Sequence, residues 1–209
     1  MARPVLTPEQ RSQLEQRQRS QILRGMAERA AADGYLSVRI ADIAKAARVS
    51  KSTFYAHFAD KEECFVALYS ITSDRTIGDM EAAHQSALAA ELPWRDHVSA
   101  VNRAMLARFA SDAALARSLV VDTQAAGPTA LEIRRDVTER FAKLVRRVSD
   151  GLGRRHDELN RITPPLSLAI VGGNNELIMR ALLAEKSLLS AAVTRPIDAM
   201  WCAVLTAPR

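Results

Sequence analysis

The 209-residue sequence contains only two cysteines, Cys64 and Cys202, which lie far apart along the chain. Two isolated cysteines supply neither a disulfide framework nor the spacing of a metal site, and their scarcity favours a reducing compartment. No apolar run approaches the roughly 20 residues that span a bilayer, and the first residues lack the apolar segment of a signal peptide. We therefore expect a soluble, cytoplasmic protein with no membrane partner.

The sequence is also poor in strand signals and in catalytic motifs. Aromatic residues make up only 5% of the chain, no alternating apolar pattern occurs, and Ala, Leu, Arg and Glu are abundant, which favours helices. The motifs of serine hydrolases, zinc proteases and phosphate-binding loops are absent. The histidines at 84, 97 and 156 have no carboxylate or cysteine at ligand spacing. We expect an all-α protein without a metal, a cofactor or catalytic residues.

The positive charge is concentrated near the N-terminus. The formal net charge is +5, and residues 1–60 hold ten Lys or Arg against six Asp or Glu. A basic region of this kind suits an anionic polymer, although charge alone does not separate nucleic acid from a membrane surface.

The segment 37–63 contains two short helical patterns separated by a break. Ile40, Ile43 and Ala47 are spaced three and four apart, as on one face of a helix. Ser50 is placed to cap a second helix from Lys51, in which Phe54 and Phe58 would face inward. The opposite face carries no carboxylate and consists of Lys51, Ser52, Tyr55 and Ala56, with Thr53 and His57 at its flanks. Such a face suits phosphates and base edges.

Two short helices joined by a tight turn form a helix-turn-helix, which lays its second helix in a DNA major groove, but an ordinary helical hairpin has similar spacing. Over about residues 20–65, the sequence resembles the DNA-binding signature of the tetracycline-repressor (TetR) family. The resemblance is carried by Gly34-Tyr35, Ile43-Ala44, the run from Ala47 through Arg48-Val49-Ser50-Lys51 to Phe58, and Lys61-Glu62. Arg48 stands where the family usually has Gly, so it is expected to adopt a left-handed conformation. The usual Thr or Ser caps of the first helix fall on Val38 and Arg39, which leaves Ser37 as the nearest capping oxygen.

The resemblance implies a DNA-binding transcriptional regulator, most commonly a repressor that binds a palindromic double-stranded DNA operator as a homodimer. It implies a three-helix helix-turn-helix domain, placed at residues 1–64, and a helical effector-binding and dimerisation domain at residues 65–209. The DNA-binding residues that we predict are Arg39, Arg48, Ser50, Lys51, Ser52, Thr53, Tyr55, His57 and Lys61. Arg3, Arg11, Arg17 and Arg19 form a basic arm that either contacts DNA or remains solvated.

The rest of the chain reads as helices. Capping signals at Thr7 and Asp60 predict helices at 8–33 and 61–89, and apolar periodicity predicts helices at 93–109, 112–125, 128–148, 164–184 and 188–205. We expect Gly151 and Gly153 to end the fifth of these seven helices, and Pro196 to kink the last or mark its start. The helix at 61–89 joins the two domains and is expected to couple them.

We expect a small, mainly apolar effector between the C-terminal helices, with Met105, Phe109, Asn175 and Glu176 as lining residues. Glu176 would then need Arg180 or a cationic ligand group as partner. The polar residues from Asn174 to Arg180 could alternatively form hydrogen bonds at an interface. A dimer through the last two helices is indicated by Gly172-Gly173, which would allow close helix approach, and by an apolar cluster of Ile197, Met200, Trp201 and Val204.

Two other functions remain compatible with the sequence. An enzyme in the C-terminal helices could be tethered to DNA, although no catalytic constellation supports it. An architectural or recombination factor would bind DNA without a small ligand and would show no effector-dependent release.

Overall fold

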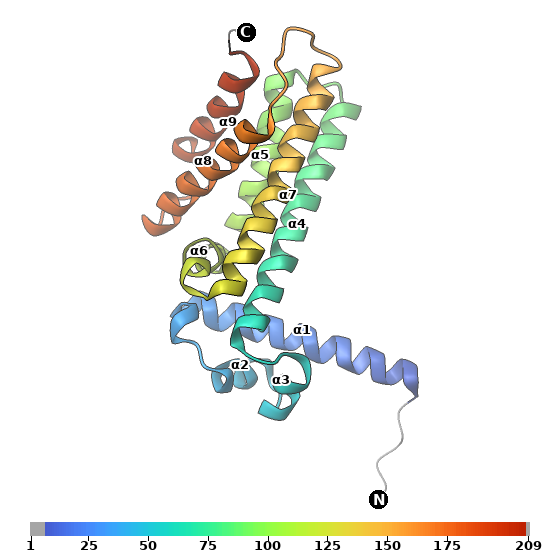
Figure 1. Ribbon diagram of the computed structural model, residues 1–209, viewed down its shortest axis with the longest axis vertical. Helices are drawn as coiled ribbons and strands as arrows, with labels where there is room; N and C mark the ends of the chain where they lie inside the picture. The colour runs from blue at the N-terminus through green and yellow to red at the C-terminus, as the bar shows by residue number, and fades with distance from the viewer. Residues whose placement is uncertain (1–6, 208–209) are drawn as a thin grey trace, which may run out of the picture.

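The computed structural model describes residues 7–207, apart from the side chains of residues 124 and 125. Over this range every regular element is a helix, which confirms the predicted fold class (Figure 1). The elements are α1 (Pro8–Asp33), η1 (Tyr35–Ser37), α2 (Ile40–Ala47), α3 (Lys51–His57), α4 (Lys61–Ala89), α5 (Trp94–Ala110), α6 (Ala113–Val121), η2 (Asp122–Ala125), α7 (Pro128–Gly153), α8 (Pro164–Leu183) and α9 (Ala191–Leu205).

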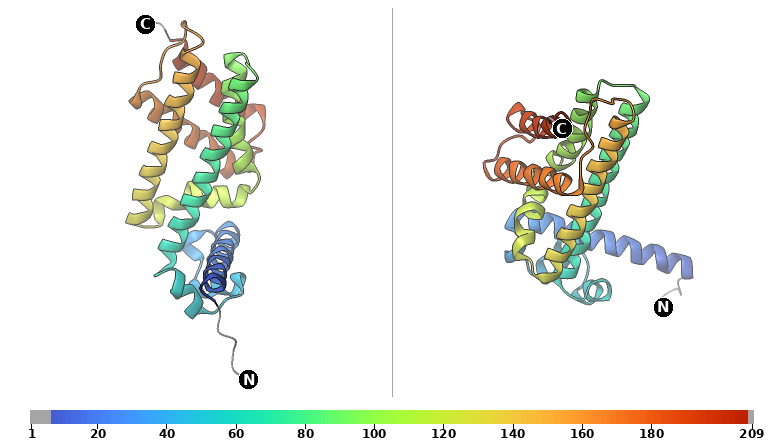
Figure 2. Two further views of the ribbon diagram at one scale, coloured as in Figure 1. Left: turned by 90° about the vertical axis from the view of Figure 1, so that its right-hand side faces the viewer. Right: turned by 45° about the horizontal axis from the view of Figure 1, so that its top comes forward.

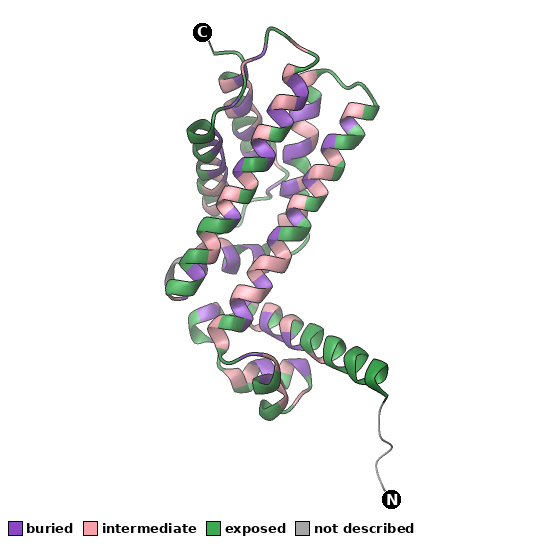
Figure 3. Ribbon diagram, turned by 45° about the vertical axis from the view of Figure 1, so that its right-hand side comes forward, coloured by how far each residue is buried: buried purple, intermediate pink, exposed green. Residues whose placement is uncertain are grey.

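The N-terminal unit forms where the C-terminal half of α1 packs on α2, α3 and the first turns of α4. Its core contains Ile22, Ile43, Phe54, Phe58 and Phe65, each fully buried. The N-terminal half of α1 is exposed on nearly all sides and projects into solvent (Figures 1 and 3).

The C-terminal unit is built on the long helices α4, α5 and α7. Helices α8 and α9 lie side by side along one flank of these helices (Figures 1 and 2). The core between them includes Leu106, Val148, Ile170, Ile197 and Trp201. The predicted boundary between residues 64 and 65 falls inside α4, which runs unbroken through both units, and the division into two domains stays a prediction.

Several predicted helix ends are shifted. The helix predicted at 112–125 ends as α6 at Val121 and continues as the 3₁₀ turn η2. Helix α7 extends beyond the predicted 148 to Gly153. Gly151 does not end α7: a Cβ atom there would lie 2.9 Å from Cε1 of His84, so the glycine allows α4 and α7 to approach. Helix α9 begins at Ala191, and Pro196 lies inside it rather than at its start.

Two predicted interface residues lie in the core instead. Ile197 and Trp201 have no solvent exposure within the monomer and pack against the other C-terminal helices, so the expectation that they face a second subunit is wrong. The two glycines of α8 also differ from each other. A Cβ at Gly173 would meet Sδ of Met200 at 2.7 Å, whereas a Cβ at Gly172 would have nothing within 4 Å. Gly173 therefore permits the packing of α9, and Gly172 is left on an open face.

Carboxylates connect the two units. Asp122 of η2 accepts hydrogen bonds from the Tyr35 backbone N–H and the Ser118 hydroxyl, both at 2.8 Å. Glu62 at the start of α4 accepts a hydrogen bond of 3.2 Å from the Ala130 N–H, one of the unpaired donors in the first turn of α7. Gly127 precedes that helix with φ of 120°, and a Cβ there would lie 2.7 Å from the Glu62 carboxylate. We call Glu62, Asp122 and the groups that they bind the interdomain latch.

Candidate nucleic-acid interface and ligand cavity

The outward face of α3 has the composition that the sequence predicts. Ser50 caps the helix, because its hydroxyl accepts a hydrogen bond of 3.0 Å from the Thr53 N–H. Phe54 and Phe58 are buried in the core of the N-terminal unit. On the opposite side, the exposed residues are Lys51, Ser52, Tyr55 and Ala56, with Thr53 and His57 half-buried beside them. Tyr55 is 56% exposed, which is a large aromatic surface to leave in water.

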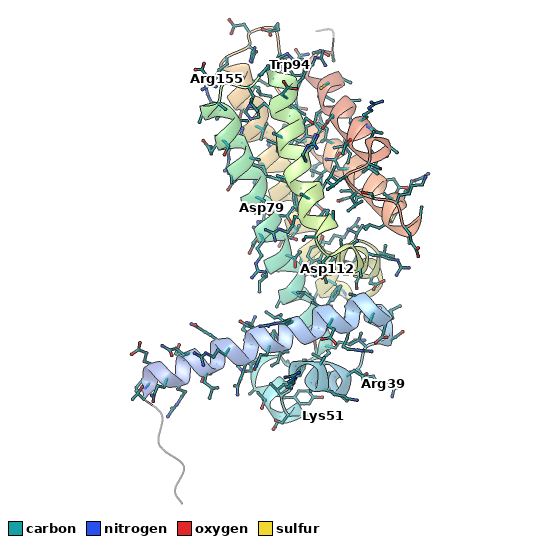
Figure 4. The ribbon with its side chains drawn as sticks, turned by 180° about the vertical axis from the view of Figure 1, so that it is seen from behind. Arg39, Lys51, Asp79, Trp94, Asp112 and Arg155 are labelled. Carbon is teal, nitrogen blue, oxygen red and sulfur yellow. The ribbon has the colours of Figure 1, made fainter. Side chains whose placement is uncertain are left out.

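Two arginines frame this face. Arg48 ends α2 in the left-handed region with φ of 55° and ψ of 40°, as its place in the turn predicts. Arg39 is the N-cap residue of α2, and its backbone N–H donates a hydrogen bond of 3.2 Å to Asp42. The expected capping oxygen of Ser37 is instead part of the 3₁₀ turn η1. Arg39 and Lys51 lie at the same end of the molecule, far from Trp94 and Arg155 (Figure 4).

His57 and Lys61 are already engaged within the monomer. Nε2 of His57 lies 3.3 Å from Oε1 of Gln18 on α1. Nζ of Lys61 donates a 3.1 Å hydrogen bond to the Tyr35 carbonyl and lies 4.3 Å from the centre of the Tyr35 ring. Burial lowers the pKa of Lys61 and raises that of Tyr35 to about 12. These contacts tie α4 to η1, and a role for either residue on the DNA backbone stays a prediction.

Arg11, Arg17 and Arg19 of the basic arm all lie on α1. Arg11 and Arg17 are exposed on the projecting part of α1, whereas the guanidinium of Arg19 stacks 4.4 Å from the centre of the Phe58 ring. Arg19 thereby supports the end of α3. Arg3 lies outside the described residues.

An apolar cavity lies between the helices of the C-terminal unit. Its free volume is about 40 Å³, which holds no more than a few water molecules. All six helices from α4 to α9 contribute to it, with Tyr69, Thr72, Ser73, Met80, Met105, Phe109, Leu119, Val120, Val137, Thr138, Phe141, Val145, Val171, Asn174, Asn175 and Trp201 as lining residues. Three of the four predicted ligand residues, Met105, Phe109 and Asn175, are among them.

Glu176 is not part of this lining. Its side chain is exposed and forms a 2.6 Å ion pair with Nε of Arg180 one turn later. Sequence reasoning missed Asn174, which is 4% exposed and lines the cavity. It also missed Tyr69 and Phe141, although their helical spacing from other apolar residues placed them on an inward face. The direction of each polar residue of α8 depends on how that helix is rotated, which its apolar sequence does not determine.

A buried pair of histidines lies at the other end of this unit. Nδ1 of His84 is 2.7 Å from Nε2 of His97, and the two residues are 2% and 1% exposed. Burial, followed by the positive charges of Arg147 and Arg154, lowers the pKa of His84. Burial and the neighbouring His84 lower the pKa of His97 to about 4. Over residues 7–207, no three His, Cys, Asp or Glu side chains are arranged to hold a metal ion, and no helix is long and apolar enough to cross a membrane.

Comparisons with known proteins agree with this geometry. A family model described as bacterial regulatory proteins of the tetR family matches residues 22–68, the segment that contains α2 and α3. No curated protein matches the sequence significantly.

Solved structures resemble the whole chain. The fatty acid degradation regulator FadR from Bacillus halodurans is 17% identical with a TM-score of 0.72, over 91% of this chain and 99% of that one. FadR from Bacillus subtilis, solved in complex with stearoyl-CoA, is 16% identical with a TM-score of 0.72 and the same coverage. A TetR-family regulator described as putative, from Mesorhizobium loti MAFF303099, is 19% identical with a TM-score of 0.71, over 91% of this chain and 96% of that one. At these identities the likeness concerns the fold.

Proposed function

Because the chain belongs to the TetR family of bacterial regulatory proteins, which are DNA-binding transcriptional regulators, we propose that it is a ligand-responsive repressor. The observation that carries the proposal is the pairing of two features in one monomer. One end presents an exposed recognition helix without carboxylates, and the other unit contains an apolar cavity between its helices. We assign no catalytic role to that cavity.

The recognition helix α3 enters the major groove in this proposal. Lys51, Ser52 and Tyr55 contact bases or adjacent phosphates, since they are the exposed polar side chains of its outer face. Thr53 and His57 contact the DNA backbone from the flanks. Ser50, Arg39 and Arg48 lie at the helix ends beside this face, and Lys61 contributes by fixing α4 to η1.

The repressor acts as a homodimer through the outward faces of α8 and α9. Leu168 and Leu183, near the two ends of α8, are 41% and 51% exposed. On α9, a stripe of small residues is exposed at helical spacing, namely Ala192, Pro196, Ala199 and Ala203. A two-fold axis along these helices would repeat the recognition helix, so the operator is an inverted repeat.

The effector is a mainly apolar small molecule that enters the cavity. A cavity of about 40 Å³ is far smaller than a typical ligand pocket of 300 Å³ or more, so binding has to move the lining helices apart. The Bacillus subtilis relative was solved with stearoyl-CoA, which supports an effector with a large apolar part for this chain also.

The movement reaches the DNA-binding unit along two routes. Helix α4 contributes Tyr69 to the cavity, and its own first turn, at Lys61, directly follows α3 in the chain. Leu119 of α6 lines the cavity and also packs in the core with Tyr35 and Phe65. Asp122 of the interdomain latch follows directly after α6, so a displaced α6 would pull on η1 through Asp122.

Operator affinity, measured by fluorescence anisotropy on DNA flanking the protein's own gene, tests the proposal. We expect tight binding without ligand and a loss of affinity of roughly 5- to 150-fold when an effector binds. A protein that binds the DNA but releases it with no ligand of a broad metabolite panel would instead fit an architectural factor. Turnover of a panel compound would indicate the tethered enzyme.

A further inference from the structure

Arg134 of α7 lies in a surface groove beside the cavity. It lines this groove together with Val120, Thr138, Gly172, Asn175, Glu176 and Met179. Three of these groove residues, Val120, Thr138 and Asn175, also line the cavity. The groove therefore adjoins the cavity across these side chains, and we call it the cavity mouth.

Arg134 is the charge at this mouth that lacks a counter-ion. Three other arginines of α7 are paired, since Arg140 binds Asp74, Arg146 binds Glu139 and Arg147 binds Glu81, and the remaining Arg135 and Lys143 are exposed to solvent rather than half-buried in the groove. Glu176 in the same groove is paired with Arg180. Within residues 7–207, half-buried Arg134 forms no ion pair. Burial raises the pKa of Tyr69 in the cavity wall, and the positive charge of Arg134 partly opposes that rise.

The cavity wall itself contains polar atoms without protein partners. Asn174 is 4% exposed, and its Oδ1 has no hydrogen-bond partner. Trp201 is fully buried, and its Nε1 also has no hydrogen-bond partner. Buried polar groups are almost always paired, so an unpaired acceptor and an unpaired donor in one cavity wall indicate a ligand with polar atoms. A purely hydrocarbon ligand would leave both unsatisfied.

We propose that the effector is an amphipathic anion, with its apolar body in the cavity and its carboxylate or phosphate group at Arg134. The inference rests on the proposed function, because it assumes that the cavity is the effector site. The planar guanidinium presents paired donors that match either acid group. Of the two partners expected for Glu176, Arg180 is the one that pairs with it, so this carboxylate gives no reason for a cationic effector.

Trp201 provides a direct reading of cavity occupancy. The chain has two tryptophans, and Trp94 is at the start of α5, stacked with Arg95. A Trp94→Phe protein leaves Trp201 as the sole tryptophan, so a change in its fluorescence reports binding in the cavity. The titrants share one alkyl chain and differ in head group: dodecanoate, dodecyl phosphate, dodecanol and dodecyltrimethylammonium, each kept below its micelle concentration.

Both anions are expected to bind at least roughly tenfold more tightly than the alcohol, and the cation more weakly than the alcohol. The tighter of the two anions identifies the head group. Arg134→Gln should reduce anion affinity to that of the alcohol without changing alcohol binding, and Arg134→Lys should retain part of it. The matched control is Arg135→Gln, which removes an exposed arginine one residue away and should change nothing.

Equal affinity for all head groups, or unchanged anion binding in folded Arg134→Gln, overturns the assignment of Arg134. If the neutral probe binds and releases operator DNA equally well, the effector cavity stands and only its charge preference is lost. If no probe changes Trp201 fluorescence, both this inference and the proposed effector function fail.

Discussion

Arg48 and Ser50 show how two residues set the orientation of the recognition helix. A non-glycine residue in the left-handed region costs roughly 1–2 kcal/mol, and Arg48 adopts that conformation at the end of α2. Ser50, two residues later, offsets part of this cost by capping α3. The chain thus reverses within three residues and presents Lys51 and Tyr55 to solvent, beside an exposed arginine.

Replacing both Lys51 and Tyr55 by Ala is expected to weaken operator binding by at least roughly 50-fold. The change removes a positive charge that would contact a DNA phosphate and the largest exposed side chain of α3. Lys51→Ala alone should also reduce the salt dependence of binding by about one counterion. Anisotropy titrations at several salt concentrations measure both effects. Lys143→Ala, which removes an exposed charge on α7, is the control for net charge. Unchanged operator affinity in the double variant would remove α3 from the interface.

The histidine pair makes the stability of the C-terminal unit depend on pH. The pKa values of His84 and His97 are lowered in the folded state, whereas both are near 6.5 in an unfolded chain. The unfolded state therefore binds more protons below that pH. The stabilisation is complete above about pH 6.5 and is lost as the pH falls toward 4.

We expect the free energy of unfolding to fall by roughly 2–3 kcal/mol between pH 6.5 and pH 4 through this pair, because a tenfold difference in proton affinity is worth about 1.4 kcal/mol. Denaturant titrations across this range measure it. A protein with both histidines changed to Asn should lose less stability over the same interval, and His156→Asn serves as control. Parallel pH profiles for wild type and the double variant would contradict the expectation.

Helix α6 is the element through which the cavity and the DNA-binding unit share side chains. Leu119 belongs to both the cavity wall and the N-terminal core. Asp122 in the following 3₁₀ turn accepts a hydrogen bond from the Tyr35 N–H. Gly127, which precedes α7, lies next to the carboxylate of Glu62. A helix that moves by a fraction of a turn would break these directional hydrogen bonds, because their geometry tolerates little displacement.

Glu62→Ala and Asp122→Ala are expected to reduce the coupling between ligand and operator. In each variant the ratio of operator affinities without and with effector should fall from roughly 5–150 toward one, because the displaced helix no longer pulls on the DNA-binding unit. Operator titrations with a saturating releasing ligand measure the ratio. Glu132→Ala changes an exposed acid of α7 and should preserve it. Full coupling after loss of both carboxylates would leave α4 as the only route.

Local sequence signals predicted where the helices begin better than which face of each helix points toward the core. The caps at Thr7, Ser50 and Asp60 all form as expected, since capping depends on residues three apart. The outward turn of Glu176 and the burial of Trp201 were not predictable, because both helices are apolar on more than one face. Gly151 looked like a helix end, but its role is set by His84, which is 67 residues earlier in the chain.

The recognition helix α3 and the proposed dimerisation helices α8 and α9 lie far apart along the long axis of the monomer (Figure 1). The recognition helix lies beyond α1, while α8 and α9 flank the long helices of the other unit (Figure 1). A small rotation of either unit about α4 would therefore move α3 over a large distance. In a two-fold dimer, the spacing of the two recognition helices must match about 34 Å or a multiple of it, so a rotation of this kind changes affinity for both half-sites together.

The dimer prediction has to be tested on the exposed stripe rather than on Trp201, whose replacement would disrupt the core. Ala199→Glu is expected to give a folded monomer at micromolar concentration, since it places a charge where a second α9 would pack. Operator affinity should fall by at least roughly tenfold, because each half-site is then bound independently. Ala107→Glu, at an exposed position of α5, is the control and should remain dimeric. Sedimentation measures the assembly state and anisotropy the affinity. A dimeric Ala199→Glu protein with full operator affinity would place the interface elsewhere.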